Sequence, residues 1–177
     1  MQWLWARHWN RELCSKDARI CVMAAKNGRL DVLKWARANG CDWNTCVCHF
    51  AACEGHLKVL QWARANGCNW NQFTCSFAAG SSHLHILQWA RNNGCDWNSS
   101  TCDMAATRGH LEVLKWARSN GCEWDSDTCA EAASGGHLNV LKWARTNGCP
   151  WEANECLEGA RANGHLHVQR WIESNQE

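Results

Sequence analysis

The sequence predicts an all-α protein, an α-solenoid of stacked helix–turn–helix repeats, and three observations lead to this class. Tryptophan recurs with a period of 27 residues, which indicates a repeated structural unit. Each copy contains two helical patterns of apolar residues. A helix pair of this size cannot bury its own apolar face, whereas stacked neighbours share a continuous core. The first tryptophan series is Trp35, Trp62, Trp89, Trp116 and Trp143, followed by Trp171 after 28 residues, and the second is Trp43, Trp70, Trp97, Trp124 and Trp151.

The repeats are expected to form a single domain over residues 1–177. The first copy, 1–27, is degenerate, and atypical terminal copies are normal in such arrays. The sequence stops at Glu177, in or just after a helix for which it shows no partner helix. Two expectations follow: the chain is part of a longer protein, or this open end pairs with another copy in a homo-oligomer. The later copies are 28–54, 55–81, 82–108, 109–135 and 136–163, with a half-repeat at 164–177.

The longer helix of each copy is clearest at residues 110–119. Its apolar side chains cluster on one side of a helical wheel and its charged side chains on the other. Asn120 and Gly121 then end the helix, because glycine adopts the left-handed conformation at little cost. Cys122 is expected to fold back onto Ala117 as the hydrophobic contact of this cap.

The second helix is predicted to be shorter and to begin after a capping side chain that accepts backbone N–H bonds. Cys129, Ala132 and Ala133 follow at i, i+3 and i+4 and give a narrow face suited to close packing. A glycine such as Gly109 then turns the chain into the next helix. Ser82 replaces this glycine once, so a positive φ is expected but not obligatory. The capping residues are Asp17, Asn44, Asn71, Asn98 and Asp125.

Composition argues against several classes of function. Lys and Arg number 18 against 17 Asp and Glu, and a net charge of +1 lacks the basic surplus that nucleic-acid binding requires. No apolar stretch approaches the roughly 18 residues that span a bilayer, so no membrane partner is expected. The first ten residues lack the order of a signal peptide. We therefore expect a cytoplasmic protein.

The run TCAEAASGGHLNVLKWARTN, residues 128–147, resembles the ankyrin repeat. Ala-Ala-x-x-Gly-His-Leu, an aliphatic helix and Asn-Gly are similar to that family's helix–turn–helix core, and the likeness covers nearly the whole chain from Cys14 onward. Cys129 and Ala130 stand where the family's Thr-Pro-Leu-His opening has leucine and histidine. The usual period is 33 residues. We therefore expect the β-hairpin fingers between repeats to be shortened or absent, and the family's finger contacts are not carried over.

The sequence also resembles the short, tryptophan- and cysteine-rich ankyrin-like arrays of giant DNA viruses and of some algae and protists. Such arrays often accompany an F-box, and no F-box pattern is visible here. The resemblance implies a protein-binding scaffold with no catalytic role, acting in the host cytoplasm if the protein is viral.

Twelve of the 14 cysteines form a C-x6-C series, for which three interpretations stay open. Reduced thiols would pack as small hydrophobic side chains, and the lack of a secretion signal favours this interpretation. Disulfides within each pair would join a loop to a helix start. Metal ligation would need the histidine eight residues on, at a spacing that matches no common zinc motif. The pairs are Cys14/Cys21, Cys41/Cys48, Cys68/Cys75, Cys95/Cys102, Cys122/Cys129 and Cys149/Cys156.

One copy carries a sharper cluster of metal-ligand types. Cys46, His49 and Cys53 lie at i, i+3 and i+7, on one face of a helix, and His56 follows. Soft ligands in this arrangement could hold zinc or copper. The alternative is a set of unrelated substitutions, which we favour because no other copy repeats them.

The recurrent tryptophan, arginine and histidine positions are interpreted as structural. Trp116 and Trp124 would fill space between stacked repeats, and Arg118 would stack on a tryptophan of its own repeat. The histidine at the start of the longer helix would hydrogen-bond to backbone between helices. Cys102 and His110 could pair as nucleophile and base, but this pair recurs in the other copies, so no enzyme is expected.

Positions that vary between copies are candidates for partner recognition. Those on the shorter helix change from aromatic to acidic along the chain, and exposed phenylalanines mark an interface. The alternative is that Phe50 and Phe77 pack between repeats and affect only stability. We predict a protein–protein interaction scaffold; the alternative is a metal-binding or redox-responsive cysteine-rich scaffold. The predicted partner-binding residues are Phe50, Phe73, Phe77, Ser100, Met104, Asp127, Glu131, Asn154 and Glu158.

Overall fold

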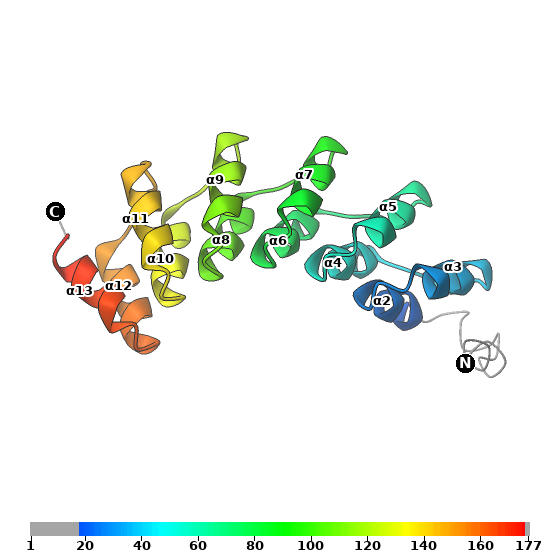
Figure 1. Ribbon diagram of the computed structural model, residues 1–177, viewed down its shortest axis with the longest axis horizontal. Helices are drawn as coiled ribbons and strands as arrows, with labels where there is room; N and C mark the ends of the chain where they lie inside the picture. Colours follow the sequence, from blue (N-terminus) through cyan, green and yellow to red (C-terminus); the bar gives the residue numbers. More distant parts are fainter. Residues whose placement is uncertain (1–17, 176–177) are drawn as a thin grey trace. The chain divides into compact units, whose positions relative to one another are not determined.

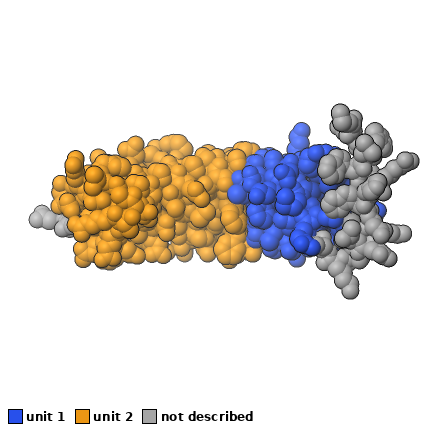
Figure 2. Space-filling model, turned by 90° about the horizontal axis from the view of Figure 1, so that it is seen from below, with its two compact units in different colours: residues 1–70 blue, residues 71–177 orange. Residues whose placement is uncertain are grey.

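The computed structural model describes residues 18–175, and all of the regular secondary structure in this range is α-helical. Asp17 and Cys14, which the sequence analysis assigned to the first repeat, lie outside it. The chain divides into two compact units, one ending at Trp70 and the other beginning at Asn71 (Figure 2). The sequence predicts one repeat domain over residues 1–177, without a boundary at residue 70.

Two kinds of helix alternate along each unit (Figure 1). Cysteine helices carry the second cysteine of each C-x6-C pair, and tryptophan helices carry the first tryptophan series. Unit one contains the cysteine helices α2 (Arg19–Lys26) and α4 (Thr45–Cys53) and the tryptophan helices α3 (Leu30–Ala38) and α5 (Leu57–Ala65). In unit two the cysteine helices are α6 (Gln72–Gly80), α8 (Ser99–Thr107), α10 (Ser126–Ser134) and α12 (Ala153–Ala162), and the tryptophan helices are α7 (Leu84–Asn92), α9 (Leu111–Ser119), α11 (Leu138–Thr146) and α13 (Leu166–Glu173).

The prediction that the cysteine helices are the shorter ones is wrong. Helices α8, α9, α10 and α11 each have nine residues. The apolar stripe of a cysteine helix is narrow because its side chains are small, and this narrowness does not shorten the helix. The β-hairpin fingers are absent, as expected: loops without strands join each tryptophan helix of the described region to the next cysteine helix.

The unit of packing is a cysteine helix with the tryptophan helix that follows it. In unit two these pairs are α6 with α7, α8 with α9, α10 with α11 and α12 with α13. The cysteine helices also pack directly on one another, α6 on α8, α8 on α10 and α10 on α12. Because small Ala and Cys side chains line their contacts, the cysteine helices approach closely, and the tryptophan helices form a second, more open row (Figure 1).

The tryptophan helices end as the sequence predicts. Gly121 has φ +82°, its N–H bonds to the Arg118 carbonyl at 3.1 Å, and the Cys122 N–H bonds to the Ala117 carbonyl at 3.0 Å. These two bonds are the Schellman arrangement of a helix C-terminus. The Asn120 side chain adds a bond from Nδ2 to the Trp116 carbonyl at 2.8 Å.

The predicted caps of the cysteine helices are largely confirmed. Asn44, Asn71 and Asp125 each accept a backbone N–H bond two residues on, at 3.0–3.1 Å. Asn98 differs, because its Oδ1 accepts from the Ser100 hydroxyl at 2.5 Å and no side-chain cap forms.

A positive φ is kept at the turn between the two helices of each pair. Gly109 has φ +74°, and Ser82, the one replacement, has φ +62°. The expected positive φ is therefore confirmed at Ser82 as well. A serine in the left-handed region is strained, because its Cβ crowds the following carbonyl oxygen.

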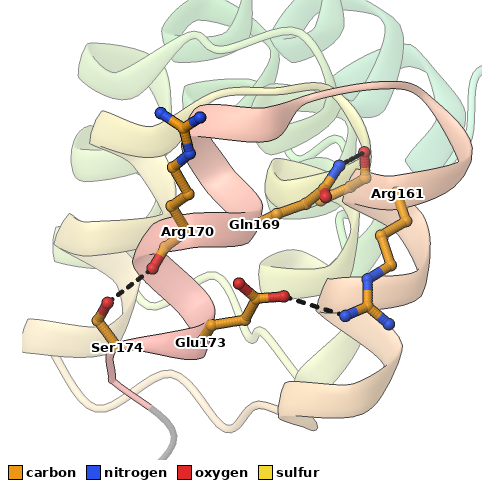
Figure 3. A network of polar contacts seen from close by, with 6 residues as sticks. Arg161, Gln169, Arg170, Glu173 and Ser174 are labelled. Atoms are coloured by element: carbon orange, nitrogen blue, oxygen red, sulfur yellow. Dashed lines mark hydrogen bonds and ion pairs between the residues drawn. The ribbon is translucent and has the colours of Figure 1, made fainter.

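The last tryptophan helix has a partner helix, contrary to the expectation of an unpaired end. Helix α13 packs on α12, and Arg161 Nη2 pairs with Glu173 Oε1 at 3.0 Å (Figure 3). Gln169 Nε2 also donates to the Ala160 carbonyl at 3.2 Å. Helix α13 of the half-repeat thus forms a pair with α12.

Candidate functional site

The eleven described cysteines of the series are buried in the core, and no disulfide links any of the thirteen cysteines of the described region. The cysteines that contact each other in space are not the two members of one C-x6-C pair. The thiol of Cys102 on α8 hydrogen-bonds to Cys122, twenty residues later, and Cys129 on α10 does so to Cys149. Each hydrogen bond joins a cysteine helix to the loop that follows the tryptophan helix of the same pair. Cys122 Sγ also donates to the Asn98 carbonyl at 3.3 Å, which ties this loop to the start of α8.

This environment keeps four of the cysteine-helix thiols protonated. The hydrogen bond to the paired thiol, followed by burial, raises the pKa of Cys75, Cys102 and Cys129. Burial, followed by the charge of Glu155, raises the pKa of Cys156 to about 11. Because the thiolate is the form that attacks electrophiles and binds metals, these thiols are suited to packing.

The candidate metal ligands of the second copy do not form a metal site. No group of three or more His, Cys, Asp or Glu side chains within residues 18–175 is arranged to hold a metal ion. His56 Nε2 lies 3.1 Å from the Lys26 carbonyl oxygen, so its ring is engaged with backbone. Cys46 and Cys53 are half-buried, and they differ in this from the eleven other described thiols.

The recurrent histidines bond backbone between neighbouring helix pairs, as predicted. His110 Nε2 lies 3.2 Å from the Gly80 carbonyl oxygen and His137 Nε2 lies 3.0 Å from that of Thr107, at the C-termini of α6 and α8. Burial lowers the pKa of His110. The Cys102 thiol bonds to Cys122 and the His110 ring to the Gly80 carbonyl, so both side chains join parts of the fold.

Each of several tryptophan helices carries an arginine that stacks on a tryptophan of the loop after the helix. The Arg118 guanidinium lies 4.2 Å from the Trp124 ring, and Trp124 meets Trp143 edge-on with 5.7 Å between ring centroids. Arg118 Nη1 also donates to the Cys122 carbonyl. The same stacking is formed by Arg91 with Trp97 and by Arg145 with Trp151. These contacts confirm the structural interpretation of both series.

The predicted partner-binding residues lie on the cysteine helices, and the second unit carries all but one of them. Phe73 and Phe77 on α6 are 48% and 38% exposed. Being four residues apart, they lie on the same face of the helix. Phe50 belongs to the first unit, where it is half-buried with the Lys26 ammonium 5.7 Å from its ring centroid.

Four further candidates occupy the equivalent places on α10 and α12. Asp127, Asn154 and Glu158 are exposed. Glu131 is half-buried, and its Oε2 accepts a bond from the Thr107 hydroxyl at 2.9 Å.

The two candidates on α8, Ser100 and Met104, are half-buried and so less accessible to a partner. Met104 is half-buried against α6, where a Cβ added at Gly80 would lie 2.9 Å from the methionine Cε. The Ser100 hydroxyl bonds to Ser76 at 2.9 Å and to Asn98. Ser100 therefore contributes to packing between α6 and α8.

Asp103 belongs to this surface and was missed by the sequence analysis. Its Oδ1 accepts a bond from the Thr128 hydroxyl at 2.6 Å. Burial raises its pKa to about 6; the Thr128 bond opposes this shift, and the charges of Asp125, Asp127 and Glu131 add to it. The variation between copies at this position, from Ser76 through Asp103 to Ala130 and Leu157, was the signal available in the sequence.

Comparison with known proteins agrees with this geometry. Residues 21–64, which span α2 to most of α5, match the family model described as "Ankyrin repeats (many copies)". A search of curated proteins gives no significant match. The crystal structure of the human ASB11 ankyrin repeat domain is similar, with a TM-score of 0.66, 17% sequence identity, and coverage of 87% of this chain and 82% of that chain. At this identity the likeness concerns the fold, which is that of an ankyrin repeat solenoid.

Proposed function

We propose that this chain is a protein-interaction scaffold that binds a partner protein through the exposed side of α6, α8, α10 and α12. Ankyrin repeats are generally protein–protein interaction scaffolds. The observation that carries the proposal is the exposure of Phe73 and Phe77 on one face of α6. Large aromatic side chains gathered at a surface are typical of binding sites.

The core explains why binding would fall on this side. The thiols, the alanines and the recurrent histidines are used in packing or in bonds between helix pairs. The varying positions of the cysteine helices include exposed aromatic and acidic side chains that can contact a partner. No helix of the described residues is long and apolar enough to cross a membrane.

The test is co-purification from the native host with the tagged full-length chain. The Phe73→Ala/Phe77→Ala variant is expected to lose the partner. The control is Leu166→Ala, which truncates a 61% exposed apolar side chain on a tryptophan helix and is expected to keep it. Circular dichroism establishes that both variants are folded. Equal recovery by the wild type and the phenylalanine variant would refute the assignment to this surface.

A further inference from the structure

The exposed side of α6, α8, α10 and α12, where the partner is proposed to bind, changes from aromatic to acidic side chains along unit two. Two columns of equivalent positions run across the four cysteine helices. One column is Phe73, Ser100, Asp127 and Asn154, and the other is Phe77, Met104, Glu131 and Glu158. The first helix presents aromatic rings and the third presents carboxylates, so the surface has a direction.

The acidic end is not neutralised by the helices that carry it. Helix α6 has no charged residue, α8 has Asp103, and α10 has Asp127 and Glu131. Helix α12 has Glu155, Glu158 and Arg161. Arg161, the one basic residue on these four helices, is paired with Glu173 of α13 at 3.0 Å.

The carboxylates repel one another across the gap between α8 and α10. Burial is the main cause of the raised pKa of Asp103, and the charges of Asp125, Asp127 and Glu131 add to it. A cation brought by a partner would relieve the repulsion. Complementary charge of this kind increases the association rate and selects between partners.

The distances limit the size of the bound segment. Packed helices lie about 8–10 Å apart, so three steps from α6 to α12 cover about 24–30 Å. An extended chain advances about 3.3 Å per residue and needs about eight residues to cover this distance.

We propose that unit two binds a segment of about eight residues of its partner protein, with an aromatic or aliphatic side chain on Phe73 and Phe77 and lysine or arginine side chains against Asp127, Glu131 and Glu158. This inference rests on the proposed function and adds the chemistry and direction of the bound segment. The apolar side chain holds one end of the segment on α6, and the basic residues determine in which direction the segment runs toward α12.

The experiment is a selection of displayed random 12-residue peptides on the full-length chain. We expect the selected peptides to combine an apolar residue with an excess of Lys and Arg toward one end. The best peptide, synthesised and labelled, is then titrated by fluorescence anisotropy. Its affinity is expected to fall at least tenfold for Phe73→Ala/Phe77→Ala and for Asp127→Lys/Glu158→Lys.

A matched control carries the same change of charge elsewhere. Glu112→Lys/Glu123→Lys replaces two exposed carboxylates of α9 and the loop after it. Its affinity for the peptide is expected to stay within twofold of the wild type. Raising the salt concentration from about 0.05 to 0.3 M should weaken wild-type binding, because exposed charges are screened.

The outcomes separate the inference from the proposed function. Failure to select any peptide, or selected peptides without excess basic residues, overturns the inference. If only the phenylalanine variant loses affinity, the surface binds peptide but the basic partner is wrong. If both variants bind like the wild type, the surface and the inference fall together.

Discussion

Neutralising Asp103 should stabilise the protein at neutral pH. Folding raises the pKa of this carboxyl from 3.8 to about 6, so the folded state holds its proton more tightly than the unfolded state. The resulting stabilisation is fully present below pH 3.8 and is lost as the pH rises through about 6. At pH 7.5 the ionised carboxylate therefore costs stability, and Asp103→Asn removes this cost while its amide oxygen can still accept the Thr128 bond.

The magnitude follows from the shift. About two pKa units at 1.36 kcal/mol each give an upper limit of about 3 kcal/mol. The side chain is only half-buried, and solvent screening reduces the gain to about 1–1.5 kcal/mol. Urea unfolding followed by tryptophan fluorescence should show this gain at pH 7.5 and only a few tenths of a kcal/mol at pH 3.5.

The control is Asp96→Asn, the same change at an exposed site in the loop after α7. It should alter the free energy of unfolding by less than about 0.5 kcal/mol at either pH. The reasoning is refuted if Asp103→Asn is no more stable than the wild type at pH 7.5, or if its gain is equally large at pH 3.5.

Three further predictions concern the turns and the thiols. Ser82→Gly should stabilise by about 0.5–1 kcal/mol in urea unfolding, because it relieves a positive φ; a loss of stability would contradict the strain. Gly109→Ala should cost about 2–3 kcal/mol, since its φ is +74° and the new Cβ would lie 2.5 Å from His137 Nδ1; an unchanged unfolding midpoint would contradict this packing. Brief alkylation with iodoacetamide and peptide mass mapping should label Cys46 and Cys53 well before the buried thiols, and uniform labelling would contradict the burial.

The features that the sequence predicts correctly are set by local chemistry. The end of α9 depends on Asn120, Gly121 and Cys122, which are adjacent in the chain and match a known cap. The stacking of Arg118 on Trp124 joins residues six positions apart. Phe73 and Phe77 are exposed on α6, and their role in partner binding stays a prediction.

The features that the sequence does not predict depend on which loops and helices meet in space. Cys102 lies seven residues from Cys95 in a visible pattern, yet its neighbour is Cys122, because the loop leaving α9 returns to the start of α8. The environment of Asp103 is set by Thr128 and the carboxylates of the next pair. No spacing within one copy reveals either contact.

Hydrogen–deuterium exchange of the full-length chain, with and without the selected peptide, tests most directly whether the cysteine helices carry the binding surface. Peptide binding should slow amide exchange in α6, α8, α10 and α12 and leave α7, α9 and α11 unchanged. Slower exchange confined to the tryptophan helices, or no change in the cysteine helices at saturating peptide, would contradict the account.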